Sequence, residues 1–226
     1  MARISRKELK RDEFVEATKE AEHWLEEHWQ TVAKIAAVVA GIAILVAIWF
    51  WYSIRTREQA ALLLDEGLSR YTQVQEGGFT DNAELETALA SFDAAARKGG
   101  RAAVGQVSLY YRGLALHRLG RPEEAIASLE ELTGNPNCPD TIAGSAHLLL
   151  AEVFVAAAEP DRAVQTLEAL IDADPPIYPV DQALMALGKV HQASGDEEQA
   201  RIVWQRVVDE YPARGSASQA RRLLGR

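Results

Sequence analysis

A stretch without charged side chains, residues 35–54, constrains this chain of 226 residues more than any other feature. Its core reads IAAVVAGIAILVAIWFWY, and Lys34 and Arg55 stand directly at its two ends. Twenty helical residues span about 30 Å, which is the thickness of the hydrocarbon layer of a bilayer. The Trp and Tyr side chains at the C-terminal end favour the headgroup zone. We therefore predict a single transmembrane helix over residues 35–54.

Two other interpretations of this stretch are a cleaved signal peptide and the core helix of a soluble domain. A signal peptide has a short charged start and small residues at its cleavage site. Here 34 residues precede the apolar stretch, and the bulky sequence WFWY ends it. A core helix is rarely apolar on every side over such a length. Both alternatives fit the sequence less well than a membrane anchor.

The N-terminal tail, residues 1–34, holds 7 Lys/Arg and 8 Asp/Glu residues. Basic residues near a membrane helix favour the cytoplasmic side, and long translocated domains contribute little to this rule. We therefore predict a cytoplasmic tail and a periplasmic C-terminal domain at a bacterial inner membrane. Between Ser5 and Thr31 the tail lacks Gly and Pro, and its apolar residues recur at helical steps. This pattern predicts an amphipathic helix, either on the membrane surface or solvated.

Small residues recur within the predicted membrane helix. Small residues four positions apart let a second membrane helix approach closely. Alanine is also common throughout this chain. The small residues therefore have two equally open interpretations. They form a contact with another membrane helix, or they only reflect the composition of the chain. The residues concerned are Ala36, Ala40, Ala43 and Ala47.

The rest of the chain contains a repeat with a period of 37 or 38 residues. In each copy an alanine is followed four residues later by a bulky apolar residue. Another apolar helical pattern precedes the alanine, and a glycine or proline separates the two patterns in the last three copies. The four pairs are Ala88/Phe92, Ala125/Leu129, Ala163/Leu167 and Ala200/Trp204. A repeat of this length predicts stacked pairs of helices.

This pattern resembles the tetratricopeptide repeat, in which a small residue on a first helix precedes an alanine and an aromatic residue on a second helix. The resemblance implies an all-α solenoid of three to four helix pairs over residues 58–226, with a C-terminal capping helix that starts near Ser216 or Ser218. Small residues such as Gly113 and Gly188 are expected where the two helices of a pair cross. Residues 58–97 form either a divergent first repeat or a neck.

Two further expectations concern single positions in the repeats. Bulky residues such as Leu129 and Trp204 are expected to fill the space between neighbouring repeats. Gly120 and Gly195 are expected in the turns between the two helices of a pair, where a positive φ is often needed. The first expectation follows from the resemblance, and the second follows from the backbone freedom of glycine.

The resemblance also implies a concave face, lined by the first helices, that binds other proteins. Aromatic and flexible apolar side chains make the better anchors in such a face, which favours Tyr110 and Met185. The alternative is that several of these residues pack inside the superhelix. The predicted face consists of Tyr110, Leu114, Arg118, Leu148, Glu152, Val155, Met185, Lys189 and Gln192.

Motifs for catalysis, cofactors or metals do not stand out in the sequence. It has no Gly-rich phosphate loop, no G-x-S-x-G and no HExxH motif. His23 and His28 are five residues apart, which turns them away from each other on a helix, so we predict no metal site. The net charge of −9 argues against binding to nucleic acid. We therefore predict a non-enzymatic chain without a cofactor.

A short tail, one membrane helix and an outer repeat domain together resemble the YfgM family, the ancillary subunit of the bacterial Sec translocon. The ending DEYPARGSASQARRLL, residues 209–224, is similar to the ends of bacterial envelope repeat proteins. This resemblance implies a role beside SecYEG that links exported proteins to periplasmic chaperones. The alternatives are an envelope scaffold or an accessory subunit of a cell-wall, division, outer-membrane assembly or secretion complex.

Overall fold

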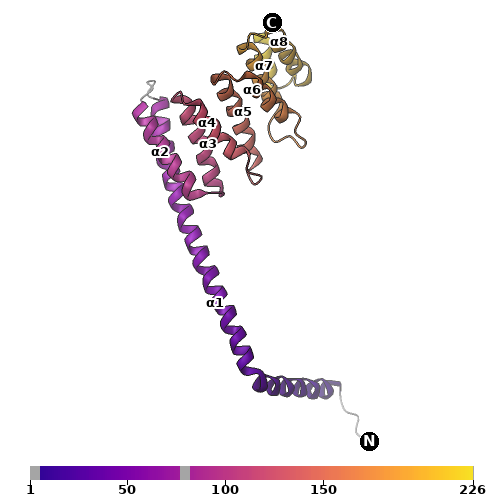
Figure 1. Ribbon diagram of the computed structural model, residues 1–226. Helices are drawn as coiled ribbons and strands as arrows, with labels where there is room; N and C mark the ends of the chain where they lie inside the picture. The colour runs from indigo at the N-terminus through magenta and orange to yellow at the C-terminus, as the bar shows by residue number, and fades with distance from the viewer. Residues whose placement is uncertain (1–5, 77–81, 226) are drawn as a thin grey trace. The chain divides into compact units, whose positions relative to one another are not determined.

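The computed structural model describes the backbone of residues 6–76 and 82–225, and the side chains of residues 28–31, 33–74 and 82–225. The described residues form nine α-helices and contain no strand, which confirms the predicted all-α class (Figure 1). The chain divides into two compact units, residues 1–54 and residues 55–226. The helices are α1 (Arg6–Glu76), α2 (Asn82–Gly99), α3 (Ala103–Arg118), α4 (Pro122–Thr133), α5 (Asp140–Ala156), α6 (Pro160–Ile171), α7 (Val180–Ala193), α8 (Glu197–Glu210) and α9 (Gly215–Leu223).

The first unit consists of the earlier part of α1 and contains the apolar stretch. Within His28–Val74 an 18-residue window reaches a mean hydropathy of 2.5, so this helix is long and apolar enough to cross a membrane. The large apolar side chains of residues 35–52 are exposed, from Ile42 at 56% to Leu45 at 68%. The predicted apolar stripe of the tail, from Phe14 to Leu25, lies outside the described side chains.

The second unit begins with the later part of α1, which pairs with α2. The Lys98 ammonium donates a hydrogen bond to Gln59 Oε1 at 2.7 Å, and Arg70 Nη1 donates to Glu84 Oε2 at 3.2 Å. The residue number rises along one helix as it falls along the other, so the two helices are antiparallel. Residues 58–97 therefore form a helix pair of the same kind as the later pairs.

Glycine permits the close crossing of the two helices within a pair. A Cβ atom on Gly113 would lie 2.7 Å from Leu129 Cγ, and one on Gly188 would lie 2.2 Å from Trp204 Nε1. The bulky residues thus pack against the glycine of their own pair. Their side chains are almost fully buried, at 0% exposure for Leu129 and 2% for Trp204.

The first pair uses the same contact with a different spacing. A Cβ on Gly67 would lie 2.6 Å from Phe92 Cε1, so these two residues correspond to Gly113 and Leu129. Sixteen residues separate Gly113 from Leu129, whereas twenty-five separate Gly67 from Phe92. The longer connection between α1 and α2 is the reason that the first repeat looks divergent in the sequence.

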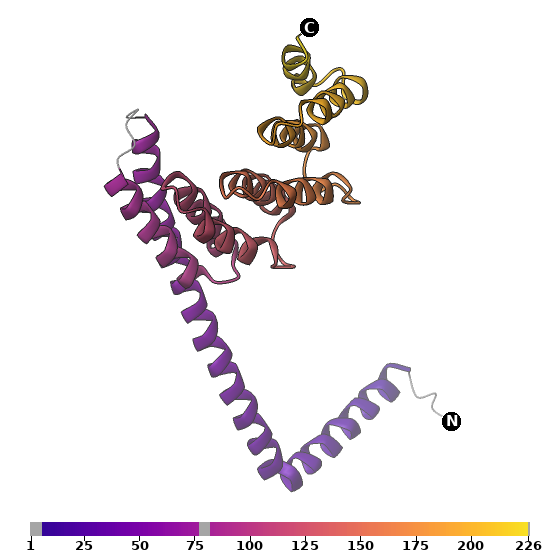
Figure 2. The same cartoon turned by 45° about the horizontal axis from the view of Figure 1, so that its top comes forward.

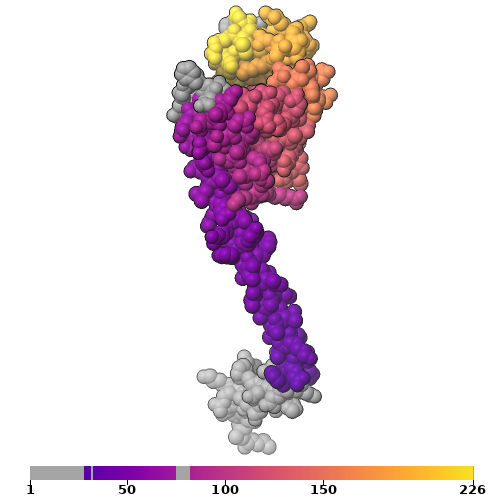
Figure 3. Space-filling view, turned by 60° about the vertical axis from the view of Figure 1, so that its left-hand side comes forward, coloured from indigo at the N-terminus to yellow at the C-terminus, as the bar shows by residue number. Residues whose placement is uncertain are grey.

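Each pair packs on the next through its second helix, which contacts the first helix of the following pair, and successive first helices also touch. Helix α3 contacts α5, α5 contacts α7, and α7 contacts α9, whereas the second helices α4, α6 and α8 make no contact with one another (Figure 2). In the space-filling view the atoms of each pair follow directly on those of the pair before it (Figure 3). Because successive first helices touch one another and successive second helices do not, the first helices line the inner side of the stack.

Left-handed residues make the turns between the two helices of a pair. Gly120 has a φ of 71° and Gly195 a φ of 82°, as the sequence predicts. The equivalent turn between α5 and α6 places Ala158 at a φ of 59°. An alanine in this conformation is strained by roughly 1–2 kcal/mol, because its Cβ approaches the following carbonyl oxygen.

We predict that Gly188→Ala lowers the free energy of unfolding by about 1–3 kcal/mol, because its Cβ would overlap Trp204. The measurement is urea unfolding of the full chain in detergent, followed by circular dichroism. Gly215→Ala is the control, because a Cβ at Gly215 meets nothing within 4 Å. Equal stability of Gly188→Ala and Gly215→Ala would contradict the close crossing.

A second prediction concerns the turn at Ala158. Ala158→Gly is expected to raise the midpoint of urea unfolding, by up to about 1 kcal/mol in free energy, because glycine removes the left-handed strain. Gly195→Ala at the equivalent turn is expected to lower the stability by a similar amount. A loss of stability in both variants would show that the turn at Ala158 is not strained.

Candidate functional site

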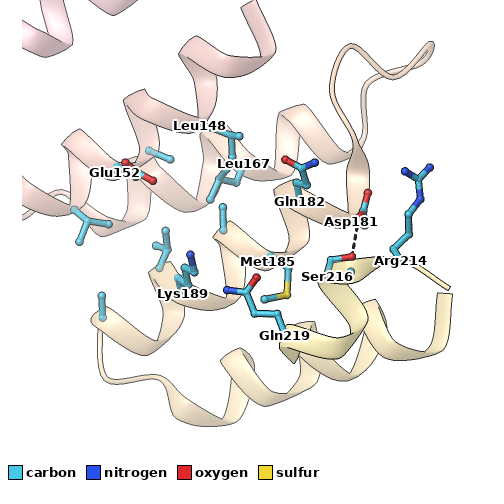
Figure 4. A pocket seen from close by; sticks show the side chains of 16 residues that line it. Leu148, Glu152, Leu167, Asp181, Gln182, Met185, Lys189, Arg214, Ser216 and Gln219 are labelled. Atoms are coloured by element: carbon cyan, nitrogen blue, oxygen red, sulfur yellow. Dashed lines mark hydrogen bonds between the residues drawn. The ribbon is translucent and has the colours of Figure 1, made fainter. Parts of the chain in front are cut away.

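A groove with a volume of about 730 Å³ runs along the inner side of the stack (Figure 4). Three first helices form its walls: α5 on one side, α7 at its centre and the start of α9 on the other side. Its principal lining side chains are Leu148, Glu152 and Val155 from α5, Gln182, Met185 and Lys189 from α7, and Arg214, Ser216 and Gln219 at the start of α9.

The floor of the groove is apolar and its rim is polar. Met185 lies at the floor and is only 5% exposed, and Leu148 packs partly against the main hydrophobic core. Glu152 and Lys189 are exposed and stand on different helices, so the rim offers both signs of charge. An apolar floor with a few polar groups along the edge is the usual chemistry of a binding groove.

A buried carboxylate attaches α9 to α7 and thereby holds the third wall in place. The Ser216 hydroxyl donates a hydrogen bond of 2.7 Å to Asp181 Oδ2, and Asp181 is 5% exposed. In the sequence Ser216 looks like a helix cap, but the first residue before α9, Arg214, makes no capping bond and the Ser216 hydroxyl turns to Asp181. The wall therefore depends on a contact between residues that are 35 positions apart.

The structure brings five of the nine sequence-predicted face residues together in this groove. They come from the two central first helices and are Leu148, Glu152, Val155, Met185 and Lys189. The groove does not include Gln192, which is exposed further along α7. It also does not include the three predicted residues of α3.

Those three residues of α3 lie against other side chains of the first two pairs. Tyr110 packs edge to face on Tyr111 with ring centroids 5.4 Å apart, and burial raises its pKa. The Arg118 guanidinium stacks over the Tyr71 ring at 4.6 Å, which is a cation–π contact. Leu114 is partly buried against the hydrophobic core. These three residues thus make contacts within the fold, while Arg118 stays exposed and Tyr110 and Leu114 are half-buried.

The contribution of α9 to the groove is absent from the sequence prediction. Arg214, Ser216 and Gln219 line the third wall, but the sequence pattern identified α9 only as a capping helix. The capping helix α9 follows α8, the second helix of the last pair. It therefore takes the place that the first helix of a further pair would occupy. That rule is the signal that would have identified these residues.

Among the described residues, no group of three or more His, Cys, Asp or Glu side chains is arranged to hold a metal ion. Burial lowers the pKa of His147, which favours the neutral imidazole. Cys138 lies in the loop between α4 and α5, where burial and the nearby Asp140 raise its thiol pKa. A raised pKa disfavours the reactive thiolate.

Sequence profiles of the tetratricopeptide repeat match most of the second unit. One profile matches residues 116–178, and another matches residues 80–140 and 148–215, which together exceed half of the chain. No curated protein matches the sequence significantly. The matched ranges include all of α5 and α7 and reach the start of α9.

We predict that Ser216→Ala lowers the free energy of unfolding by about 1–3 kcal/mol, because the buried Asp181 carboxylate loses its hydroxyl donor. The loss should be accompanied by faster proteolysis at the C-terminal end, where α9 is attached. Ser218→Ala, on the exposed side of the same helix, is the matched control. If both variants behave like the unaltered chain, the attachment of α9 does not depend on this bond.

Proposed function

This chain belongs to the tetratricopeptide repeat family, and we propose that it is a membrane-anchored module that binds other proteins in the groove between α5, α7 and α9. The groove carries the proposal, because it has an apolar floor and a rim with both signs of charge. These features suit an extended or helical segment of polypeptide, which offers apolar side chains and polar backbone groups together.

The anchor in this proposal is the stretch 35–54. Its support is the exposure of large apolar side chains such as Leu45 and Trp49, both at 68%, along a helix of spanning length. In water, a continuous apolar surface of this kind drives association, whereas a bilayer covers it. With the tail in the cytoplasm, the repeat domain is displayed on the periplasmic side of a bacterial inner membrane.

The more specific proposal is an accessory role beside the Sec translocon. In this role the membrane helix holds the chain at the channel, and the groove holds an exported chain or a periplasmic chaperone. The order of tail, single apolar helix and repeat domain supports this role. Three exposed charged side chains line the groove, Glu152, Lys189 and Arg214, and they offer polar contacts to a bound segment.

A crosslinking experiment in living cells tests the proposal. A photoreactive amino acid replaces Gln182 or Gln219, which line the groove, and the captured proteins are identified by mass spectrometry. Gln165, exposed on the second helix α6, is the matched control position. We expect capture of exported chains, periplasmic chaperones or translocon subunits from the groove positions only.

The other outcomes are also decisive. Capture of one defined envelope complex would replace the Sec role with that of a dedicated scaffold or accessory subunit. Equal capture from Gln165 and the groove positions would show that the groove is not the binding site. A lack of any specific capture at Gln182 and Gln219 would contradict the binding function itself.

A further inference from the structure

A long segment of the acidic repeat domain contains only basic charges. Residues 55–226 carry 17 Lys/Arg and 25 Asp/Glu residues, yet residues 94–122 include six Lys/Arg and no Asp or Glu. Three of the six, Arg97, Lys98 and Arg101, are exposed around the short turn between α2 and α3. The Arg97 side chain, for example, is 69% exposed.

This turn lies against Gln59 of α1, a residue that follows the apolar stretch closely in the sequence. The Lys98 ammonium donates its 2.7 Å hydrogen bond to Gln59, which is five residues after Ile54, the last residue of the stretch. Five helical residues extend roughly 7–8 Å, which is within one Debye length at physiological salt. Arg55 and Arg57 occupy the same interval and add to the basic charge.

The backbone of the turn is fixed in place. Gly100 has a φ of 51°, and a Cβ on Gly105 would lie 2.2 Å from the Gly100 carbonyl oxygen, so the two helices meet at a tight corner. The Gln106 side chain, 2% exposed, donates a hydrogen bond of 2.9 Å to the Arg101 carbonyl oxygen. The three basic side chains therefore project from a rigid corner of the fold.

The acidic side chain that forms an ion pair with this corner is Asp93. Asp93 pairs with Arg97 and lies 3.6 Å from the Arg112 guanidinium, so its single charge is shared between two arginines. Lys98 makes its hydrogen bond with an uncharged amide, and Arg101 has no ion pair among the described residues. The corner consequently keeps a positive charge.

We propose that the α2–α3 turn is a membrane-contact surface that binds the phosphate groups of anionic lipids through Arg97, Lys98 and Arg101. The proposal rests on the proposed membrane anchor, which places lipid headgroups near Gln59. Anionic headgroups attract basic side chains within a Debye length of the surface, and the contact weakens as salt rises. The repeat domain then meets the membrane at two points, through its helix and through this corner.

The experiment uses the full chain with Cys138→Ser, reconstituted in vesicles and carrying a nitroxide spin label at Ala103→Cys, an exposed residue beside the turn. A nickel-chelating lipid relaxes nitroxides that lie near the headgroups. We expect the relaxation in vesicles with 30% phosphatidylglycerol to exceed that in pure phosphatidylcholine by roughly twofold or more. The difference should disappear in 1 M salt.

Charge variants give the matched comparison. Arg97→Gln, Lys98→Gln and Arg101→Gln together should abolish the difference between the two lipid mixtures. Arg201→Gln, Arg221→Gln and Arg222→Gln remove the same charge from α8 and α9 and should leave it unchanged. If the first triple variant loses its helical circular dichroism, the chain with the unaltered turn still tests the membrane contact. Its label is compared between the two lipid mixtures and between low and high salt.

A second label at Leu45→Cys separates this proposal from the anchor on which it rests. Accessibility of that label to oxygen but not to a water-soluble nickel complex places residue 45 in the hydrocarbon layer. If residue 45 is in the bilayer and the label at residue 103 shows no lipid dependence, the membrane contact is refuted and the anchor stands. If residue 45 is in water, both proposals are wrong.

Discussion

The close crossing of two helices within each pair is the contact on which the repeat domain depends. It places a small residue on one helix where the other helix presents a bulky apolar side chain, as with Gly188 beneath Trp204. The resulting pairs are rigid, compact units with almost fully buried contacts. Each pair packs on the next through its second helix, successive first helices also touch, and the groove between α5, α7 and α9 lies along these first helices.

The two units of the chain differ in how their large apolar side chains are shielded from water. In the repeat domain most large apolar side chains are buried in two hydrophobic clusters, and acidic residues outnumber basic ones. Along residues 35–54 the large apolar side chains are exposed, and no charged residue interrupts them. The proposed bilayer covers the exposed apolar side chains of the first unit, as internal packing covers those of the second unit. The basic turn between α2 and α3 would then mark the level at which the two environments meet.

The repeat period could be predicted because the contacts that create it are local. Gly113 and Leu129 belong to one helix pair, so their spacing reappears in later copies such as Gly188 and Trp204. Gly67 was missed because its partner, Phe92, lies beyond a longer connection. The sequence pattern identifies a pair when the connection between its helices has the usual length. It misses a pair whose connection is longer.

The groove was predicted only in part because it depends on how successive pairs are stacked. The pattern places Arg118 on a first helix, but only the packing of the first two pairs shows that it lies over Tyr71. Likewise, the bond between Ser216 and Asp181 joins two helices that no repeat motif relates. Residues of α5 and α7 were found because both helices lie in well-matched repeats.

Labelling of Cys138, the single cysteine of the chain, tests the central claim that one helix displays the repeat domain outside the cytoplasm. Cys138 is partly exposed in the loop between α4 and α5. A maleimide that does not cross the inner membrane is added to cells whose outer membrane has been permeabilised, with detergent-solubilised protein as the control. We expect labelling of membrane-bound protein in these cells. Labelling that occurs only after the inner membrane is dissolved would place the repeat domain in the cytoplasm and contradict the account.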